Sequence, residues 1–159
     1  MPTNNCYKIE NHVYKLLNIS RSQHHVKKMK RIDSMCASAR KHSSWMAKTG
    51  NFVHSNWGFE NIAWIIHPGL SDYAIAKHFH NQWMNSPDHR ANILHMSNNQ
   101  VGIGVVKKGT KFYATQQFSH GSVSNQLPNK IKNQSDSYWL YVTMIVVVLF
   151  FILFVYIIS

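Results

Sequence analysis

Cysteine is scarce in this chain, which has only Cys6 and Cys36 among its 159 residues. Two cysteines form at most one disulfide, and their positions match no cysteine-based zinc motif. Cys36 lies in an apolar helical pattern, so we expect it to be a small buried residue. The sequence therefore leaves room for one disulfide and excludes a metal centre built on cysteine.

Several other signals are absent as well. Residues 1–20 contain no continuous apolar run of the length that a secretory signal peptide needs. No segment repeats along the chain, and no helix-turn-helix, zinc-finger or RNA-binding signature is present. We therefore expect one domain of ordinary size plus an appendage, no cleaved leader, and no nucleic-acid partner.

Acidic residues are few, because six Asp and Glu stand against 17 Lys and Arg, which gives a formal net charge of +11. This charge lies entirely in residues 1–136. Much of it comes early, in Arg21, Lys27, Lys28, Lys30, Arg31, Arg40 and Lys41. A basic face of this kind favours anionic lipids or anionic polymers, and its simplest interpretation is a solvated surface near a membrane.

Charge is missing altogether from residues 138–158, which are rich in Val, Ile, Leu and Phe. At about 1.5 Å per residue this run spans roughly 30 Å, the thickness of a bilayer's hydrocarbon core. Aromatic residues typical of the membrane interface stand at its ends, namely Tyr138, Trp139, Tyr141 and Tyr156. The alternative is a buried core helix, which a domain this small cannot enclose. We predict a single-pass C-terminal anchor with membrane lipids as partners.

The flanks of this predicted span bear on its orientation. Lys130 and Lys132 precede it and only Ser159 follows it. The positive-inside rule then places the globular domain in the cytoplasm.

Apolar periodicity predicts helices over residues 8–18, from 32 to a stop at Gly50, from a cap at Ser71 to 83, and over 87–94. Residues 21–31 are predicted to be a basic connection. Residues 60–66 predict a strand, and 101–106 with 111–118 predict a hairpin. Helices beside a small antiparallel sheet make an α+β fold. We divide the chain into a tail (1–7), a domain (8–120), a polar linker (121–137) and a transmembrane helix (138–158).

The segment Trp83-Met-Asn-Ser-Pro-Asp-His-Arg-Ala-Asn-Ile-Leu94 joins the last two predicted helices. Ser86 is a good N-cap and Asp88 favours the positive end of the second helix. His89 then falls in its first turn, and His54 and Glu60 come earlier in the chain. Two histidines and a carboxylate are the residue types from which polar sites are built.

The layout resembles the CAP superfamily, which includes cysteine-rich secretory, antigen 5 and pathogenesis-related 1 proteins, and whose module is the SCP domain. The resemblance covers roughly residues 9–119 and is closest to the short, cysteine-poor microbial branch. Its landmarks are Ala39-Arg-Lys-His-Ser43, Phe52-Val-His54, Glu60-Asn-Ile-Ala63, Trp83-Met-Asn-Ser86, His89-Arg-Ala-Asn-Ile-Leu94, Val101-Gly-Ile-Gly104 and Phe112-Tyr113.

This resemblance implies an α-β-α sandwich with a cleft, in which two histidines and two glutamates can hold a divalent metal. His54 and His89 match the two histidines, and Glu60 matches the first glutamate. Ser86 stands where many relatives have the second glutamate, so the set is incomplete. Relatives usually work outside the cytoplasm, which is opposite to the side that the flanking lysines predict.

Three interpretations of this cleft remain open from the sequence. It can be a braced binding cleft that also involves Ser86 and Arg90, a zinc site on His54 and His89, or a hydrolytic centre with Glu60 as the candidate base. The main hypothesis is a membrane-anchored module that binds lipid, sterol or anionic surface polymer through this cleft and the basic face. The alternatives are a metal-dependent, peptidase-like hydrolase and a protein-interaction domain displayed on a membrane.

Overall fold

The computed structural model of the protein describes residues 6–67 and 69–121. Within that part of the chain, four helices and four strands follow one another in the order α1, β1, α2, β2, α3, α4, β3, β4. The helices are α1 (Cys6–Gln23), α2 (Asp33–Thr49), α3 (Asp72–Met84) and α4 (Pro87–Leu94). The strands are β1 (Lys30–Arg31), β2 (Phe59–Ile66), β3 (Gln100–Lys108) and β4 (Lys111–Ser119).

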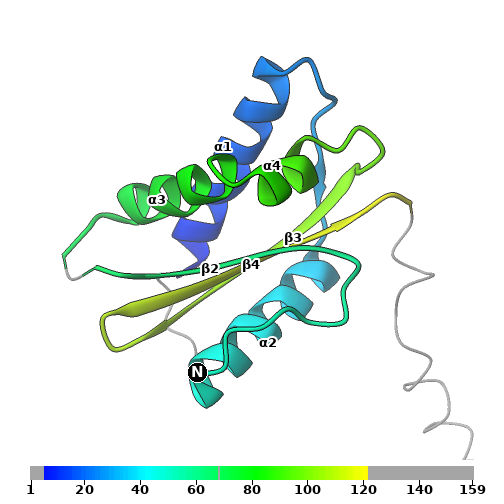
Figure 1. The fold of residues 1–159 in the computed structure, drawn as a ribbon. Coiled ribbons are helices and arrows are strands. Elements are labelled where there is room, and N and C mark those ends of the chain that lie inside the picture. The colour runs from blue at the N-terminus through cyan, green and yellow to red at the C-terminus, as the bar shows by residue number, and fades with distance from the viewer. Residues whose placement is uncertain (1–5, 68, 122–159) are drawn as a thin grey trace, which may run out of the picture. The chain divides into compact units, whose positions relative to one another are not determined.

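The strands form one sheet in the order β1-β3-β4-β2, so β2 is an edge strand. Helices α1, α3 and α4 cover one face of this sheet and α2 covers the other (Figure 1). The expected mixed α+β fold is therefore confirmed. One detail was wrong, because β1 pairs parallel to β3 and the sheet is mixed rather than wholly antiparallel. A two-residue strand is too short to show any periodicity, which is why its segment was expected to be irregular.

Most helix boundaries follow the local signals in the sequence. α2 ends before Gly50, whose φ of 79° is left-handed and whose N–H donates to the Met46 carbonyl. The Ser71 hydroxyl accepts the Ala74 N–H at the start of α3, as expected of an N-cap. Ser86 occupies the N-cap position of α4, but its side chain makes no capping hydrogen bond. α1 runs from Cys6 to Gln23, well beyond the expected range at its C-terminal end, so Arg21 is helical.

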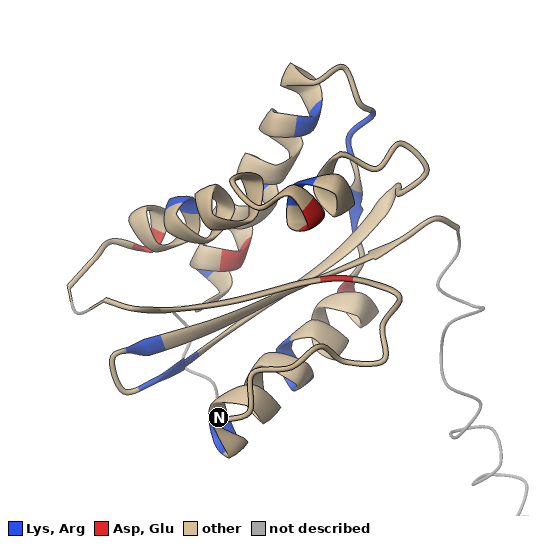
Figure 2. Cartoon of the chain, in the orientation of Figure 1, with Lys and Arg blue, Asp and Glu red and all other residues tan. Residues whose placement is uncertain are grey.

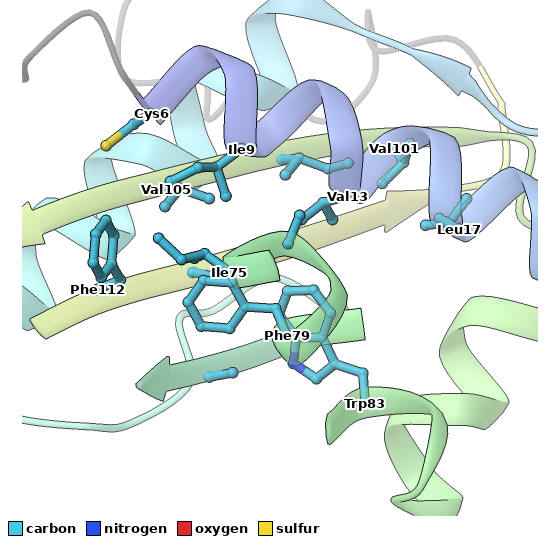
Figure 3. Packing of buried hydrophobic residues seen from close by; sticks show 14 of the residues in the cluster. Cys6, Ile9, Val13, Leu17, Ile75, Phe79, Trp83, Val101, Val105 and Phe112 are labelled. Atoms are coloured by element: carbon cyan, nitrogen blue, oxygen red, sulfur yellow. The ribbon is translucent and has the colours of Figure 1, made fainter. Parts of the chain in front are cut away.

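The main core lies between the sheet and the helices of its first face. Along one stripe of α1, Ile9, Val13 and Leu17 point toward α3, whose Phe79 and Trp83 stack with ring centroids 5.7 Å apart (Figure 3). Phe79 and Trp83 were expected in the core, and this is confirmed. Trp45 was expected there too, wrongly. It is 40% exposed on α2 and stacks on the His42 ring instead.

The opposite helix, α2, packs closely against β3 at two glycines. A Cβ at Gly104 would lie 2.1 Å from the Arg40 backbone nitrogen, and one at Gly102 would lie 2.2 Å from the Met35 carbonyl carbon. Only a residue without a side chain fits at these two positions. Both cysteines are buried and free, and Cys36 is the small buried residue that was expected.

The basic face is smaller than the sequence suggested. Lys and Arg are spread over the helices and both ends of the sheet, with few acidic residues between them (Figure 2). Arg21 is fully buried, and both Arg31 and Arg40 bind the buried Glu10 carboxylate. These three arginines hold the fold together and are not free to bind a partner. The lysines of the early basic run remain exposed, namely Lys27, Lys28, Lys30 and Lys41.

The predicted anchor at 138–158, with its interface residues Tyr138, Trp139, Tyr141 and Tyr156, lies outside the described residues. The same holds for all but the first residue of the polar linker. Among residues 6–67 and 69–121, no helix combines the length and the apolar character needed to cross a bilayer.

Candidate functional site

The Glu60 carboxylate lies at the start of β2, and its side chain is only 1% exposed. Oε1 accepts hydrogen bonds from the Ser55 N–H at 2.8 Å and from His54 Nδ1 at 3.1 Å. Oε2 accepts from the Ser55 hydroxyl and from Gln117 Nε2, the latter at 3.0 Å. A carboxylate offers about four lone-pair sites, so four donors occupy its capacity. Glu60 thereby ties the loop before β2 to the neighbouring strand β4.

His54 lies in this loop with its ring largely open to solvent, because the side chain is 53% exposed. From α2, His42 places its Nε2 atom 3.0 Å from the Val53 carbonyl of the same loop and 3.8 Å from Glu60 Oε1. His42 was missed as a site residue, although it belongs to the Ala39–Ser43 landmark. The loop is thus held from both β2 and α2.

His89 projects from the first turn of α4, as its position in the sequence predicts, and is half-buried. Burial lowers the pKa of its imidazole, and the nearby His54 lowers it further, while Asp88 raises it. The Asn61 side chain of β2 donates to the His89 carbonyl at 3.0 Å and fixes α4 on β2.

The residues present do not fit a zinc centre. Among the described residues, no group of three or more His, Cys, Asp or Glu side chains is placed to hold a metal ion. Catalytic zinc typically has three protein ligands, whereas His54 and His89 supply two. The oxygens of Glu60 are already used by four donors, and Ser86 replaces the carboxylate that the family resemblance implies.

A groove of about 600 Å³ runs along β2 beside this cluster. Ser86 and His89 line it, as does Trp83, whereas His54, Glu60 and Arg90 are not among its lining residues. Arg90 is exposed on α4. His54 and Glu60 therefore lie beside one end of the groove and do not form its floor.

The rest of the groove lining was not foreseen from the sequence. It consists of Phe52, Ile62, Ala63, Trp64, Ile65, Ile66, His67, His78 and Gln82. His67 and His78 meet with ring centroids 5.6 Å apart, and Lys111 Nζ lies 3.8 Å from the centre of the Trp64 ring. The groove is therefore apolar along β2 and carries positive or imidazole groups around it. Trp64 and Ile66 alternate with buried residues, but the sequence does not show that β2 is an edge strand.

Comparisons with known proteins agree with this architecture. The model of the cysteine-rich secretory protein family matches residues 14–118. An outer surface protein of Borrelia burgdorferi is 12% identical, with a TM-score of 0.57 over 76% of this chain and 98% of that one. Hookworm platelet inhibitor is also 12% identical, with a TM-score of 0.57 over 77% and 73%.

A structure of NaASP2 with Zn²⁺ is 13% identical to this chain, with a TM-score of 0.51 over 76% of this chain and 82% of that one. At such low identity these likenesses show a shared fold and nothing more. Among curated protein sequences, none matches the chain.

Proposed function

The chain belongs to the CAP family, the cysteine-rich secretory proteins, and from that premise we propose that it is a membrane-anchored binding module rather than an enzyme. In this proposal three exposed lysines, Lys27, Lys28 and Lys30, bind anionic lipid headgroups, and we call them the lysine cluster. The groove along β2 binds a ligand of its own. The observation that carries the proposal is that Glu60 is buried and fully hydrogen-bonded.

A general base needs a free lone pair within reach of the proton that it removes. Glu60 is buried, and its four acceptor sites are taken by backbone and side-chain donors. This arrangement supports a bracing role, in which Glu60 holds the loop of His54 against the sheet. No observation on this chain favours the hydrolase that would use His54 and His89 as zinc ligands, and the zinc in NaASP2 belongs to that protein.

The position of the lysine cluster supports the membrane part of the proposal. Lys30 pairs with Gln100 of β3, which in turn pairs with Ser119 at the end of β4. The chain thus leaves the sheet at the same end where the cluster lies. The predicted span begins at residue 138, and the intervening residues reach at most about 60 Å. A tether of this length lets the cluster reach the bilayer surface.

The charge of the cluster suits an anionic surface. A lysine close to such a membrane contributes about 1 kcal/mol of binding free energy. This attraction falls off over about one Debye length, and added salt shortens that length. The three lysines have no salt-bridge partner among the described residues. They are therefore free to act together.

We expect the lysine cluster to be protected from amine-reactive labelling when the full chain is reconstituted in anionic phosphatidylserine liposomes. Compared with neutral phosphatidylcholine liposomes, labelling of Lys27, Lys28 and Lys30 should fall about fivefold, because each contact is worth about 1 kcal/mol. Residue-resolved mass spectrometry provides the measurement. The exposed Lys41, Lys48 and Lys77 are internal controls in the same molecule and should label equally in both lipids.

High salt serves as a second control, because roughly 1 M salt shortens the Debye length to about 3 Å and should remove the protection. Equal labelling of the cluster in both lipids at low salt would show that it does not face an anionic membrane.

A further inference from the structure

Every second residue of β2 turns its backbone N–H and C=O groups away from the sheet. Within residues 6–67 and 69–121, β4 is the one strand that pairs with β2. Residues of an antiparallel pair alternate between bonding to the neighbouring strand and facing away from it. Directly after β2, the His67 N–H donates to the Thr110 carbonyl at 3.1 Å, which places the odd-numbered residues toward β4. The even-numbered residues therefore turn their N–H and C=O groups to the free edge.

The first half of this edge is covered by side chains from the helices. Asn92 of α4 donates to the Glu60 carbonyl at 3.3 Å, and Trp83 of α3 donates to the Ile62 carbonyl at 3.2 Å. Beyond Ile62, no hydrogen bond within residues 6–67 and 69–121 engages the outward groups of Trp64 and Ile66. These two residues line the groove and have exposed fractions of 40% and 55%.

This open edge discriminates between ligand classes. A hydrocarbon chain or sterol lying in the groove would cover the outward N–H and C=O of Trp64 and Ile66 without giving them a partner, which is costly. An extended peptide brings donors and acceptors at the spacing of a β-strand and adds to the sheet at such an edge. The backbone of β2 therefore favours a peptide over a lipid in the groove.

The ammonium and imidazole groups around the groove indicate the character of that peptide. Lys111 lies over the Trp64 ring, while His67, His78 and His89 stand along the lining. No Asp or Glu is among the described residues that line the groove. Carboxylate side chains on the incoming strand would meet complementary groups, whereas a basic peptide would be repelled.

We propose that the edge of β2 at Trp64 and Ile66 binds an extended acidic segment of another protein as an added strand. This rests on the proposed binding function and names the ligand class of its groove. The added strand pairs its backbone with Trp64 and Ile66 and packs its apolar side chains against the walls of the groove. Carboxylates on the Trp64 face of the added strand lie near Lys111, and carboxylates on its opposite face lie near the histidines.

The test uses the full chain in neutral phosphatidylcholine nanodiscs, where the lysine cluster has no anionic lipid to bind. The probe is a fluorescent hexapeptide in which Glu and Val alternate, followed by anisotropy. Ile66→Pro removes the outward N–H without touching the bonds to β4, a change that edge strands tolerate. Ile66→Ala is the matched control, because it shortens the side chain and keeps the N–H. We expect Ile66→Pro to bind about tenfold more weakly than Ile66→Ala.

A second measurement covers the case in which Ile66→Pro does not fold, as judged by circular dichroism. The same peptide with N-methyl groups on alternate residues cannot pair as a strand, and the unaltered chain should bind it about tenfold more weakly. Equal binding of the two peptides, equal affinity of the two folded variants, or equal binding of a Lys-Val hexapeptide would overturn the proposal. So would binding of oleate but not of the Glu-Val peptide, which would leave the proposed binding function standing.

Discussion

Replacing Arg21 by methionine is expected to lower the free energy of unfolding by about 5 kcal/mol. Arg21 Nε donates to the Lys27 carbonyl at 2.7 Å, and Nη2 donates to the Asn98 carbonyl at 2.8 Å. Nη1 donates to the carbonyls of Ile93 and His95 at 2.6 and 3.0 Å. A hydrogen bond from a charged donor contributes about 1.5–3 kcal/mol, and the four are not fully additive.

The guanidinium of Arg21 therefore satisfies carbonyls at the C-terminal end of α4 that no helical N–H can reach. In the part of the chain that the structure describes, Arg21 has no acidic partner, and burial lowers its pKa from the usual value. Methionine fills much of the same space but leaves all four carbonyls without this donor. Urea denaturation measures the change, and Arg90→Met, at an exposed arginine of α4, is the matched control with an expected effect below about 0.5 kcal/mol. An Arg21→Met effect as small as that of the control would refute this role.

Glu10→Gln is expected to lower the free energy of unfolding by about 4 kcal/mol. The buried Glu10 carboxylate accepts Arg40 Nε at 2.8 Å and Nη2 at 2.6 Å, and Arg31 Nη2 at 2.8 Å. It also accepts the Val105 N–H at 3.1 Å. These contacts join α1 to β1, α2 and β3, and the hydrogen bonds to Glu10 raise the pKa of Arg40.

Glutamine keeps the shape of this side chain but removes its charge and turns an amide N–H₂ toward two guanidinium groups. A double-mutant cycle with Arg40→Gln isolates the pair, and denaturant unfolding supplies the four free energies. We expect a coupling energy between Glu10 and Arg40 of about 2 kcal/mol or more, because Glu10 is desolvated while Arg40 remains partly exposed. A coupling energy near zero would mean that the two residues act independently.

The elements that were predicted correctly are those whose signals are local. Gly50, Ser71 and Pro87 mark helix boundaries through their own backbone chemistry, and the two β-like runs joined by the turn at 107–110 identify a hairpin. Arg21 illustrates what such signals miss. Three of its four acceptors lie 72 to 77 residues away along the chain, so in the sequence it is indistinguishable from a solvated basic residue.

The candidate site was likewise predictable from the sequence only in part. His54, Glu60 and His89 were identified by their resemblance to family motifs, which depend on residue type and order. The function of Glu60 depends on donors from Ser55 and from Gln117, the latter 57 residues away. The groove depends on the sheet order, because the edge position of β2 leaves the outward backbone groups of Trp64 and Ile66 without a partner among the described residues. Neither feature has a local signature in the sequence.

We infer that the cluster of His54, Glu60 and His89 braces a binding groove and is not a metal centre. The most direct measurement is the zinc content of the full chain after incubation with one equivalent of Zn²⁺ and gel filtration at pH 7. From this inference we expect well below one zinc per chain, with the same content in the His54→Ala/His89→Ala double variant and in a His24→Ala/His25→Ala control. One tightly held zinc per chain, lost in the His54→Ala/His89→Ala variant and kept in the control, would contradict it.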